Sequence, residues 1–251
     1  MDYSLDALLV MSLYLDLLKR TLTRTLFMEG EAFDKRSKGL DWPGQGDAET
    51  MIGLERLTNI EELGGNVIDE DVPGDFVECG VWRGGATIFM AGVLADSDYL
   101  NDPTTGRPRC VWVCDSFEGC PEGNPNYPQD QGDPHHTFKF LSVSENEVRR
   151  NFQKYNLLDD NIKFVKGWFE NSLPGPIEKI ALLRADGDLY SSQSQILNAL
   201  YDRVSPGGYV IIDDYYNIAG SHHAVNDFRE KRGITSPMIR VDWCAAYWRK
   251  E

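Results

Sequence analysis

Hydrophobic residues recur along the start of the chain at the spacing of one face of a helix. This stripe consists of Leu5, Leu8, Leu9, Leu13 and Leu17. A loop rich in glycine and charge follows at residues 35–50. A second helix is predicted to begin near Asp47, with Glu49 and Thr50 in its first turn, and to continue through residues 51–63.

From residue 74 onward, short apolar runs alternate with segments of helical periodicity. This alternation is typical of βαβ units and predicts an α/β fold with a mainly parallel sheet. The runs around residues 180–183 and 209–212 are almost continuously apolar, as expected of strands covered on both faces. The tail, residues 237–251, is predicted to form a closing hairpin or edge pair. The predicted strands are residues 74–81, 110–117, 162–168, 179–188 and 207–216.

Residues 118–140 differ from the rest of this region. They contain four prolines and three glycines and few apolar residues. Loops of this length are usually binding loops, lids or disordered segments. Because the segment follows a strand, it should lie over the carboxyl edge of the sheet, where ligands bind in open α/β folds. We expect a lid that orders over a ligand, rather than a dispensable insertion.

Composition limits the classes of protein that the chain can belong to. The 251 residues, 41% of them hydrophobic, suffice for one full core or a core with a small cap. The longest apolar runs are too short to span a membrane, so no membrane partner is expected. A net charge of −15 disfavours nucleic acid. Five cysteines without a paired framework suggest free thiols in a reducing, cytoplasmic compartment.

The turn after the first strand, residues 78–85, has the features of a cofactor site. Glycines there allow a ligand to approach the backbone closely. Trp82 occupies the middle glycine position of the dinucleotide pattern and weakens an NAD interpretation, and Glu78 would repel a phosphate. The alternative is that Gly80 and Gly84 only make a tight strand-to-helix turn.

The second strand ends in Asp115 and Ser116, and an acid at this point can accept hydrogen bonds from ribose hydroxyls. A glycine turn followed by an acid on the next strand is the pattern of S-adenosylmethionine sites, although it also occurs in nucleotide sites. Trp168 follows a later strand, where adenine often stacks, and is a weaker candidate for a cofactor contact.

Two pairs of carboxylates follow two other strands, and the strand ends should lie on the same edge of the sheet. Carboxylate oxygens suit Mg²⁺, Mn²⁺ or Ca²⁺ rather than zinc. A dication would remove the repulsion between the acids and could lower the pKa of a substrate hydroxyl. We expect Asp186, Asp213 and Asp214 to bind the metal and Asp188 to act as general base. The alternative is that Asp186 and Asp188 cap a helix that begins near Leu189.

Long, ordered segments of the chain resemble the macrocin O-methyltransferase family. These are GLDWPGQGDAETMIGLERLTN, GDFVECGVWRGGATIFMAGVL, VWVCDSFEGCP, FKFLSVSENEVRRNF, ALLRADGDLYSS and GGYVIIDDYY. They extend from about Gly39 to the C-terminus, so the resemblance covers most of the chain.

The resemblance implies a class I methyltransferase fold, a Rossmann-like sheet of seven strands with the last antiparallel. An N-terminal helical cap, residues 1–71, would precede the methyltransferase domain, residues 72–251. The resemblance also implies that Asp186, Asp213 and Asp214 bind Mg²⁺ and that Asp188 is the general base. The expected cofactor contacts are Glu78, Gly80, Asp115, Ser116, Thr50 and Met51.

The family methylates sugar hydroxyls of antibiotics and other natural products. The expected activity is therefore S-adenosylmethionine- and Mg²⁺-dependent O-methylation of a glycosylated natural product. The resemblance also suggests an oligomer, and we expect a homodimer. The acceptor and the roles of His135, His136, His222 and His223 stay open.

Two other functions compete with this one. In a metal-dependent glycosyltransferase, Asp186-Gly187-Asp188 would bind a nucleotide-sugar diphosphate, with Arg83 and Arg184 as the only well-placed cations. A non-catalytic protein could instead bind a small ligand at the sheet edge, but clustered acids would then cost stability without a function.

Overall fold

The sheet at the centre of the molecule has seven strands in the order β3-β2-β1-β4-β5-β7-β6. A computed structural model describes residues 12–42, 46–97 and 101–251; Leu5, Leu8 and Leu9 of the predicted stripe lie outside them. The strands β1 to β5 pair in parallel, whereas β7 is antiparallel to both β5 and β6. The predicted α/β class, the seven-stranded sheet and the closing hairpin are therefore confirmed. The strands are β1 (Asp75–Cys79), β2 (Val111–Asp115), β3 (Ile162–Lys166), β4 (Ile180–Ala185), β5 (Val204–Ile212), β6 (Ile239–Arg240) and β7 (Ala246–Arg249).

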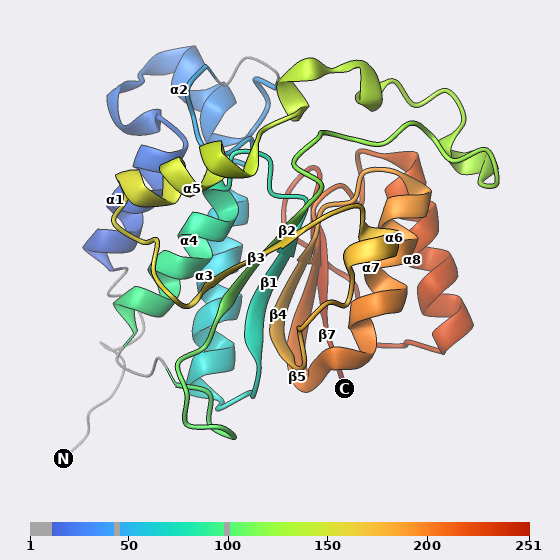
Figure 1. Ribbon diagram of the computed structural model, residues 1–251. Helices are drawn as coiled ribbons and strands as arrows, with labels where there is room; N and C mark the ends of the chain where they lie inside the picture. Colours follow the sequence, from blue (N-terminus) through green and yellow to red (C-terminus); the bar gives the residue numbers. More distant parts are fainter. Residues whose placement is uncertain (1–11, 43–45, 98–100) are drawn as a thin grey trace.

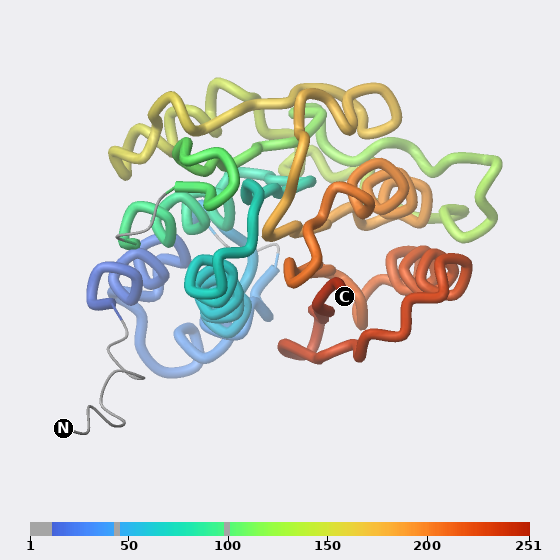
Figure 2. The backbone as a smooth tube through the Cα atoms, turned by 90° about the horizontal axis from the view of Figure 1, so that it is seen from below, coloured from blue at the N-terminus to red at the C-terminus, as the bar shows by residue number. Residues whose placement is uncertain are grey.

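Helices cover both faces of the sheet, with α1, α3, α4 and α5 on one face and α6, α7 and α8 on the other (Figure 1). The two layers of helices are also separate when the molecule is seen from below (Figure 2). The helices are α1 (Leu13–Leu22), α2 (Gly30–Ser37), α3 (Leu54–Asp69), α4 (Gly85–Asp96), α5 (Glu145–Lys154), α6 (Phe169–Ser172), α7 (Tyr190–Leu200) and α8 (Ala219–Arg232).

Alternation along the strands divides the core between these two faces. On β1, Phe76 belongs to the core under α1, α3 and α4, whereas Val77 and Cys79 belong to the core under α7 and α8. This follows from the two-residue period of a strand. The first core includes Leu15 and Leu18 of α1 together with residues of α4, so α1 packs on the same core as the central sheet.

The start of the second helix differs from the prediction. Helix α3 begins at Leu54, not near Asp47, and the residues before it form turns. The reason is non-local: the Glu49 N–H donates to the Leu22 carbonyl at 3.1 Å, and the Gly85 N–H donates to the Glu49 carbonyl at 2.9 Å. These bonds hold the segment across the start of α4 and replace the bonds of a helix.

The lid, residues 118–140, crosses above the carboxyl ends of the strands (Figure 1). It contains the short 3₁₀ turns η2 (Pro128–Asp130) and η3 (His135–Thr137), and η4 (Lys139–Leu141) begins at its end. Asp130 is buried and accepts the Ser191 N–H at the start of α7, at 3.3 Å from each of its oxygens. Tyr127 packs against Tyr190 with ring centroids 5.4 Å apart. The middle of the lid is thus attached to α7.

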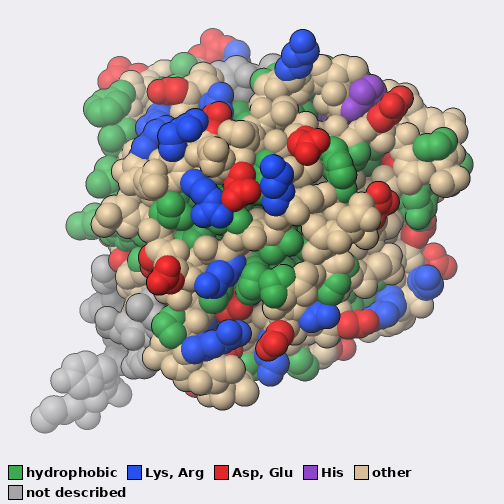
Figure 3. Space-filling model, in the orientation of Figure 1, with side chains coloured by type: hydrophobic (Ala, Val, Ile, Leu, Met, Phe, Trp, Pro, Cys, Tyr) green, Lys and Arg blue, Asp and Glu red, His purple; other side chains and the backbone are tan. Residues whose placement is uncertain are grey.

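Three expectations from the sequence, about the thiols, membranes and nucleic acid, can be compared with the described residues. Their five cysteines are all free thiols. None of their helices combines the length and apolar character that a membrane span needs. On the face in Figure 3, acidic and basic side chains are interspersed, without a broad basic patch that would suit a phosphate backbone.

Candidate active site

A cavity of about 820 Å³ opens at the carboxyl edge of the sheet, under the lid. The register of the sheet explains why the chemistry gathers there. Backbone bonds join Gly80 to Cys114, Asp186 to Cys79 and Asp213 to Ala185, so the ends of four adjacent strands lie side by side. Every site residue predicted from the sequence lines this cavity: Thr50, Met51, Glu78, Gly80, Asp115, Ser116, Trp168, Asp186, Asp188, Asp213 and Asp214.

Three acids form what we call the acid cluster, namely Asp186, Asp188 and Asp214. One carboxylate oxygen from each lies within 4.8 Å of the others. Burial and the charge of Asp186 raise the pKa of Asp188 to about 7. Burial and the charges of Asp213 and Asp188 raise the pKa of Asp214 to about 7. An all-oxygen donor set whose members repel one another fits a hard dication such as Mg²⁺ or Mn²⁺.

Asp213 lies beside this cluster but has other partners. Its two carboxylate oxygens lie 2.8 Å from Nη1 of Arg56 and 2.5 Å from Nη2 of Arg184. Burial alone would raise the pKa of Asp213, but Arg184 and Arg56 lower it below its ordinary value. The structure therefore groups Asp188, rather than Asp213, with Asp186 and Asp214, and the separate roles of Asp188 and Asp213 stay predictions.

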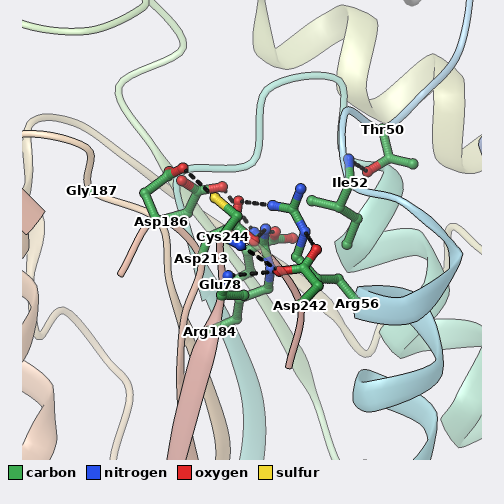
Figure 4. Close-up of polar contacts among 12 residues, drawn as sticks. Thr50, Ile52, Arg56, Glu78, Arg184, Asp186, Gly187, Asp213, Asp242 and Cys244 are labelled. Atoms are coloured by element: carbon green, nitrogen blue, oxygen red, sulfur yellow. Dashed lines mark hydrogen bonds and ion pairs between the residues drawn. The ribbon is translucent and has the colours of Figure 1, made fainter. Parts of the chain in front are cut away.

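Beneath the acids is a buried network of charged side chains (Figure 4). Arg184 contacts Asp186 at 3.0 Å and also pairs with Glu78, which is its register partner on the neighbouring strand. Arg56 of α3 lies 3.0 Å from Asp242, which precedes β7. Burial raises the pKa of Glu78 to about 7, although Arg184 opposes this shift. The network connects α3, the central strands and the C-terminal hairpin at the site.

Two thiols approach the acid cluster. The Sγ atom of Cys120, in the lid, donates to Asp188 at 3.3 Å, and the Sγ atom of Cys244 donates to Asp214 at 3.1 Å. Burial, reinforced by the neighbouring carboxylates, raises the pKa of both thiols. They are therefore protonated donors that orient the carboxylates, and not nucleophiles.

The alternative role for Asp186 and Asp188, as helix caps, is not supported. Helix α7 begins at Tyr190, and its N-cap residue is Leu189, which makes no side-chain cap bond. Asp130 of the lid contacts the first turn instead. Asp188 also has a φ of 53°, in the left-handed region that is unfavourable for most residues.

The turn after β1 has the glycine, the acid and the cavity that a cofactor site requires. Gly80 has a φ of 85°, and a Cβ atom there would lie 2.0 Å from the Asp186 carbonyl oxygen, so close packing alone already requires glycine. Asp115 accepts from the N–H groups of Val81 and Phe117, each at 2.7 Å. A carboxylate has further lone pairs, so Asp115 can still accept from a ribose hydroxyl.

The segment that contains Glu49 packs against the end of this turn, where the Gly85 N–H donates to the Glu49 carbonyl. Glu49 is buried and contacts Arg24 at 2.6 Å and the Tyr155 hydroxyl at 2.8 Å. It thereby fixes the following residues, Thr50 and Met51, on the wall of the cavity.

Among the histidines left open by the sequence, only His135 lines the cavity. Its Nδ1 atom lies 2.7 Å from Asp133. His222 contacts the Tyr215 carbonyl at 3.0 Å. Sequence reasoning gave no role in the site to Arg56, Asp242, Cys120 or Cys244. A basic residue within the apolar run of β4 was a visible signal for Arg184, whereas nothing local pointed to Asp242.

The two cations that a glycosyltransferase would need for a diphosphate are both engaged. Arg184 is buried among Glu78, Asp186 and Asp213. Arg83 donates to the carbonyls of Gly46 and Ala48 at 2.8 and 2.9 Å. The glycosyltransferase alternative is therefore not supported.

Comparisons with known proteins agree with this geometry. The family model described as TylF macrocin-O-methyltransferase matches residues 28–250. The chain is 44% identical to demethyldecarbamoylnovobiocin O-methyltransferase of Streptomyces niveus, over 95% of this chain and 94% of that protein. It is 39% identical to mycinamicin III 3''-O-methyltransferase of Micromonospora griseorubida, over 95% and 96%.

Solved structures show the same fold. The O-methyltransferase NovP superposes with a TM-score of 0.86 at 44% identity, covering 95% of this chain and 98% of that one. The calicheamicin methyltransferase CalS11, at 20% identity, shares the fold with a TM-score of 0.63 and covers 99% and 97%. With the acid cluster and the glycine turn on one cavity, these matches establish that the chain is an O-methyltransferase of the TylF macrocin-O-methyltransferase family.

Proposed function

We propose that the enzyme transfers a methyl group from S-adenosylmethionine to a sugar hydroxyl of a glycosylated natural product, with the help of Mg²⁺. The observation that carries this proposal is that the β1 turn and the acid cluster line a single cavity. The names of the relatives add the acceptor class: they refer to demethyldecarbamoylnovobiocin, to a rhamnosyl-tetracenomycin and to mycinamicin III.

The residues would divide the work as follows. Asp115 and Ser116 would bind the ribose, Gly80 would allow close approach, and Trp168 would lie against the adenine. Glu78, beneath the turn, would favour the positive charge of a sulfonium group. Thr50 and Met51 would cover the methionine end.

The acids would hold the other reactant. When bound, S-adenosylmethionine supplies an electrophilic methyl group, and a dication supplies positive charge that lowers the pKa of an acceptor hydroxyl. Asp186, Asp213 and Asp214 are the proposed metal ligands. Asp188 would accept the hydroxyl proton while the methyl group passes from the sulfur, which leaves as S-adenosylhomocysteine, to the acceptor oxygen. Residues of the lid would exclude water from the reacting atoms.

Binding and activity measurements test the proposal. S-adenosylhomocysteine should bind in calorimetry, and a UDP-sugar should not. Methyl transfer to a panel of deoxysugar-bearing scaffolds should stop on addition of EDTA and resume with excess Mg²⁺. If the UDP-sugar binds and S-adenosylhomocysteine does not, the proposed methyl transfer is wrong. Full activity in EDTA would show that the proposed Mg²⁺ dependence is wrong. The proposed homodimer and cytoplasmic location are separate predictions.

A further inference from the structure

Four aromatic rings from two distant parts of the chain pack together, and two of them line the cavity. We call Trp42, His135, Phe138 and Phe140 the aromatic cluster. Trp42 follows α2, and the other three belong to the lid. The Trp42 ring centroid lies 6.1, 5.8 and 5.6 Å from those of His135, Phe138 and Phe140. Phe138 and Phe140 are stacked at 5.7 Å.

Part of this aromatic surface is open to solvent. Trp42 is 39% exposed and Phe140 is 37% exposed. Single exposed apolar residues are ordinary, but contiguous apolar surface beside a cavity marks a binding site. Trp42 and His135 line the same cavity as the acid cluster, and so does Trp243.

Polar contacts hold the rings in place. Trp82, in the cofactor turn, donates from Nε1 to the Phe140 carbonyl at 2.8 Å. Trp243 donates to the Lys38 carbonyl at 2.8 Å, close in sequence to Trp42. The Asp133 carboxylate holds the ring of His135 at 2.7 Å. A surface that is fixed before binding loses little entropy when a ligand arrives, so the arrangement suits recognition and not only closure of the lid.

We propose that the aromatic cluster is a subsite for a planar aromatic aglycone of the acceptor. The inference rests on the proposed function, because it assumes that the sugar hydroxyl reaches the acid cluster in the same cavity. The acids provide polar chemistry for the sugar end, whereas the rings provide stacking and edge contacts for a flat apolar group. The subsite would thus select acceptors by their aglycone, apart from the chemistry at the hydroxyl.

The test uses the free aromatic probe 4-methylumbelliferone, titrated by calorimetry into the full chain with and without S-adenosylhomocysteine. Wild-type protein should bind the probe. Trp42→Ala should weaken probe binding about 10-fold, and Trp42→Phe, which keeps a ring, by less than about 3-fold. Phe140→Leu should also weaken it. Phe27→Ala is the matched control, since Phe27 is 93% exposed and belongs neither to the aromatic cluster nor to the lining of the cavity.

The possible results of these titrations separate the subsite from the proposed methyl transfer. No binding to wild type, or equal binding to Trp42→Ala and wild type, overturns the subsite. A parallel loss of S-adenosylhomocysteine affinity in Trp42→Ala would also overturn it, because the ring would then contact the cofactor. Wild-type protein that binds 4-methylumbelliferone but no S-adenosylhomocysteine would leave the subsite standing and reject the proposed methyl transfer.

Discussion

At the scale of single residues, the proposed metal site has two possible ligand sets, which differ in whether Asp188 or Asp213 binds the metal. Asp188 lies with Asp186 and Asp214, whereas both oxygens of Asp213 contact arginines. We predict that Asp188→Asn lowers kcat by about 10²- to 10⁴-fold, as loss of a general base does, with unchanged affinity for Mg²⁺ and S-adenosylhomocysteine. Single-turnover rates and calorimetry measure the two effects.

Asp213→Asn is the matched comparison, because it makes the same chemical change one strand away. It should weaken Mg²⁺ binding if Asp213 is a ligand. It should also lower the melting temperature, since Arg56 and Arg184 lose a buried partner. If Asp188→Asn weakens Mg²⁺ binding and Asp213→Asn does not, Asp188 is the ligand and the assignment of the base is wrong.

The raised pKa values of the cluster predict how stability depends on pH. Asp188 and Asp214 have pKa values of about 7 when folded, against about 4 in the unfolded chain. Between these values the folded state holds protons that the unfolded state has lost, so stability without metal falls as pH rises through this window. Each ionising carboxyl should cost about 1 kcal/mol or more.

Thermal unfolding without metal should therefore give a lower melting temperature at about pH 8 than at about pH 5, and the difference should shrink in Asp188→Asn. Mg²⁺ should stabilise the protein more at the higher pH, where no protons must be displaced. A pH-independent difference between wild type and Asp188→Asn would contradict the shifted pKa.

Site residues could be predicted from the sequence where a local pattern marks them. Acids directly after apolar strands could be recognised because parallel strands end at the same edge. The partnership of Arg56 and Asp213 could not, because the two residues are 157 positions apart and nothing in either segment encodes the other.

At the scale of elements, the segment before α3 shows why local patterns mislead. The polar and apolar order of residues 47–53 is compatible with a helix, but its backbone bonds go to Leu22 and Gly85. At Gly53 a Cβ atom would lie 2.4 Å from the Ser37 carbonyl oxygen, so close packing also shapes the segment. The central strands and the helices after them, whose signals are local, were predicted correctly.

The contacts of Glu49 lead to a prediction about how this segment affects binding of S-adenosylmethionine. Its contacts with Arg24 and Tyr155 hold Thr50 and Met51 in the cavity wall. We expect Glu49→Gln to raise KM for S-adenosylmethionine about 10-fold with a smaller change in kcat, because the segment would lose its attachment. Arg24 is 31% exposed, so the loss of stability should be about 1–3 kcal/mol.

Initial rates at varied cofactor concentration and chemical unfolding measure these effects. Tyr155→Phe removes one hydrogen bond and keeps the ring, and should give a weaker form of the same change. An unchanged KM in Glu49→Gln, in a variant of lowered stability, would limit Glu49 to a purely structural role.

At the scale of the whole molecule, the outer surface of the first helices predicts how two chains associate. On α1, Leu13 is 87% exposed and Leu17 is 52% exposed, one helical turn apart. Their neighbours Leu15 and Leu18 are buried in the core, so the helix is apolar on two sides. An apolar second side is expected where a helix also packs against another subunit.

If the predicted homodimer forms through this surface, Leu17→Glu should shift it to monomer, because a charge would be buried in the interface. Sedimentation velocity over a range of concentrations measures the shift. Asn198→Glu, which adds the same charge on α7, should leave association unchanged. In Figure 1, α1 lies at the edge of the molecule, apart from the central strands β1, β4 and β5, so Leu17→Glu should still bind S-adenosylhomocysteine. A wild-type protein that sediments as a monomer at every concentration would show that the homodimer prediction is wrong, and a Leu17→Glu dimer would place the interface elsewhere.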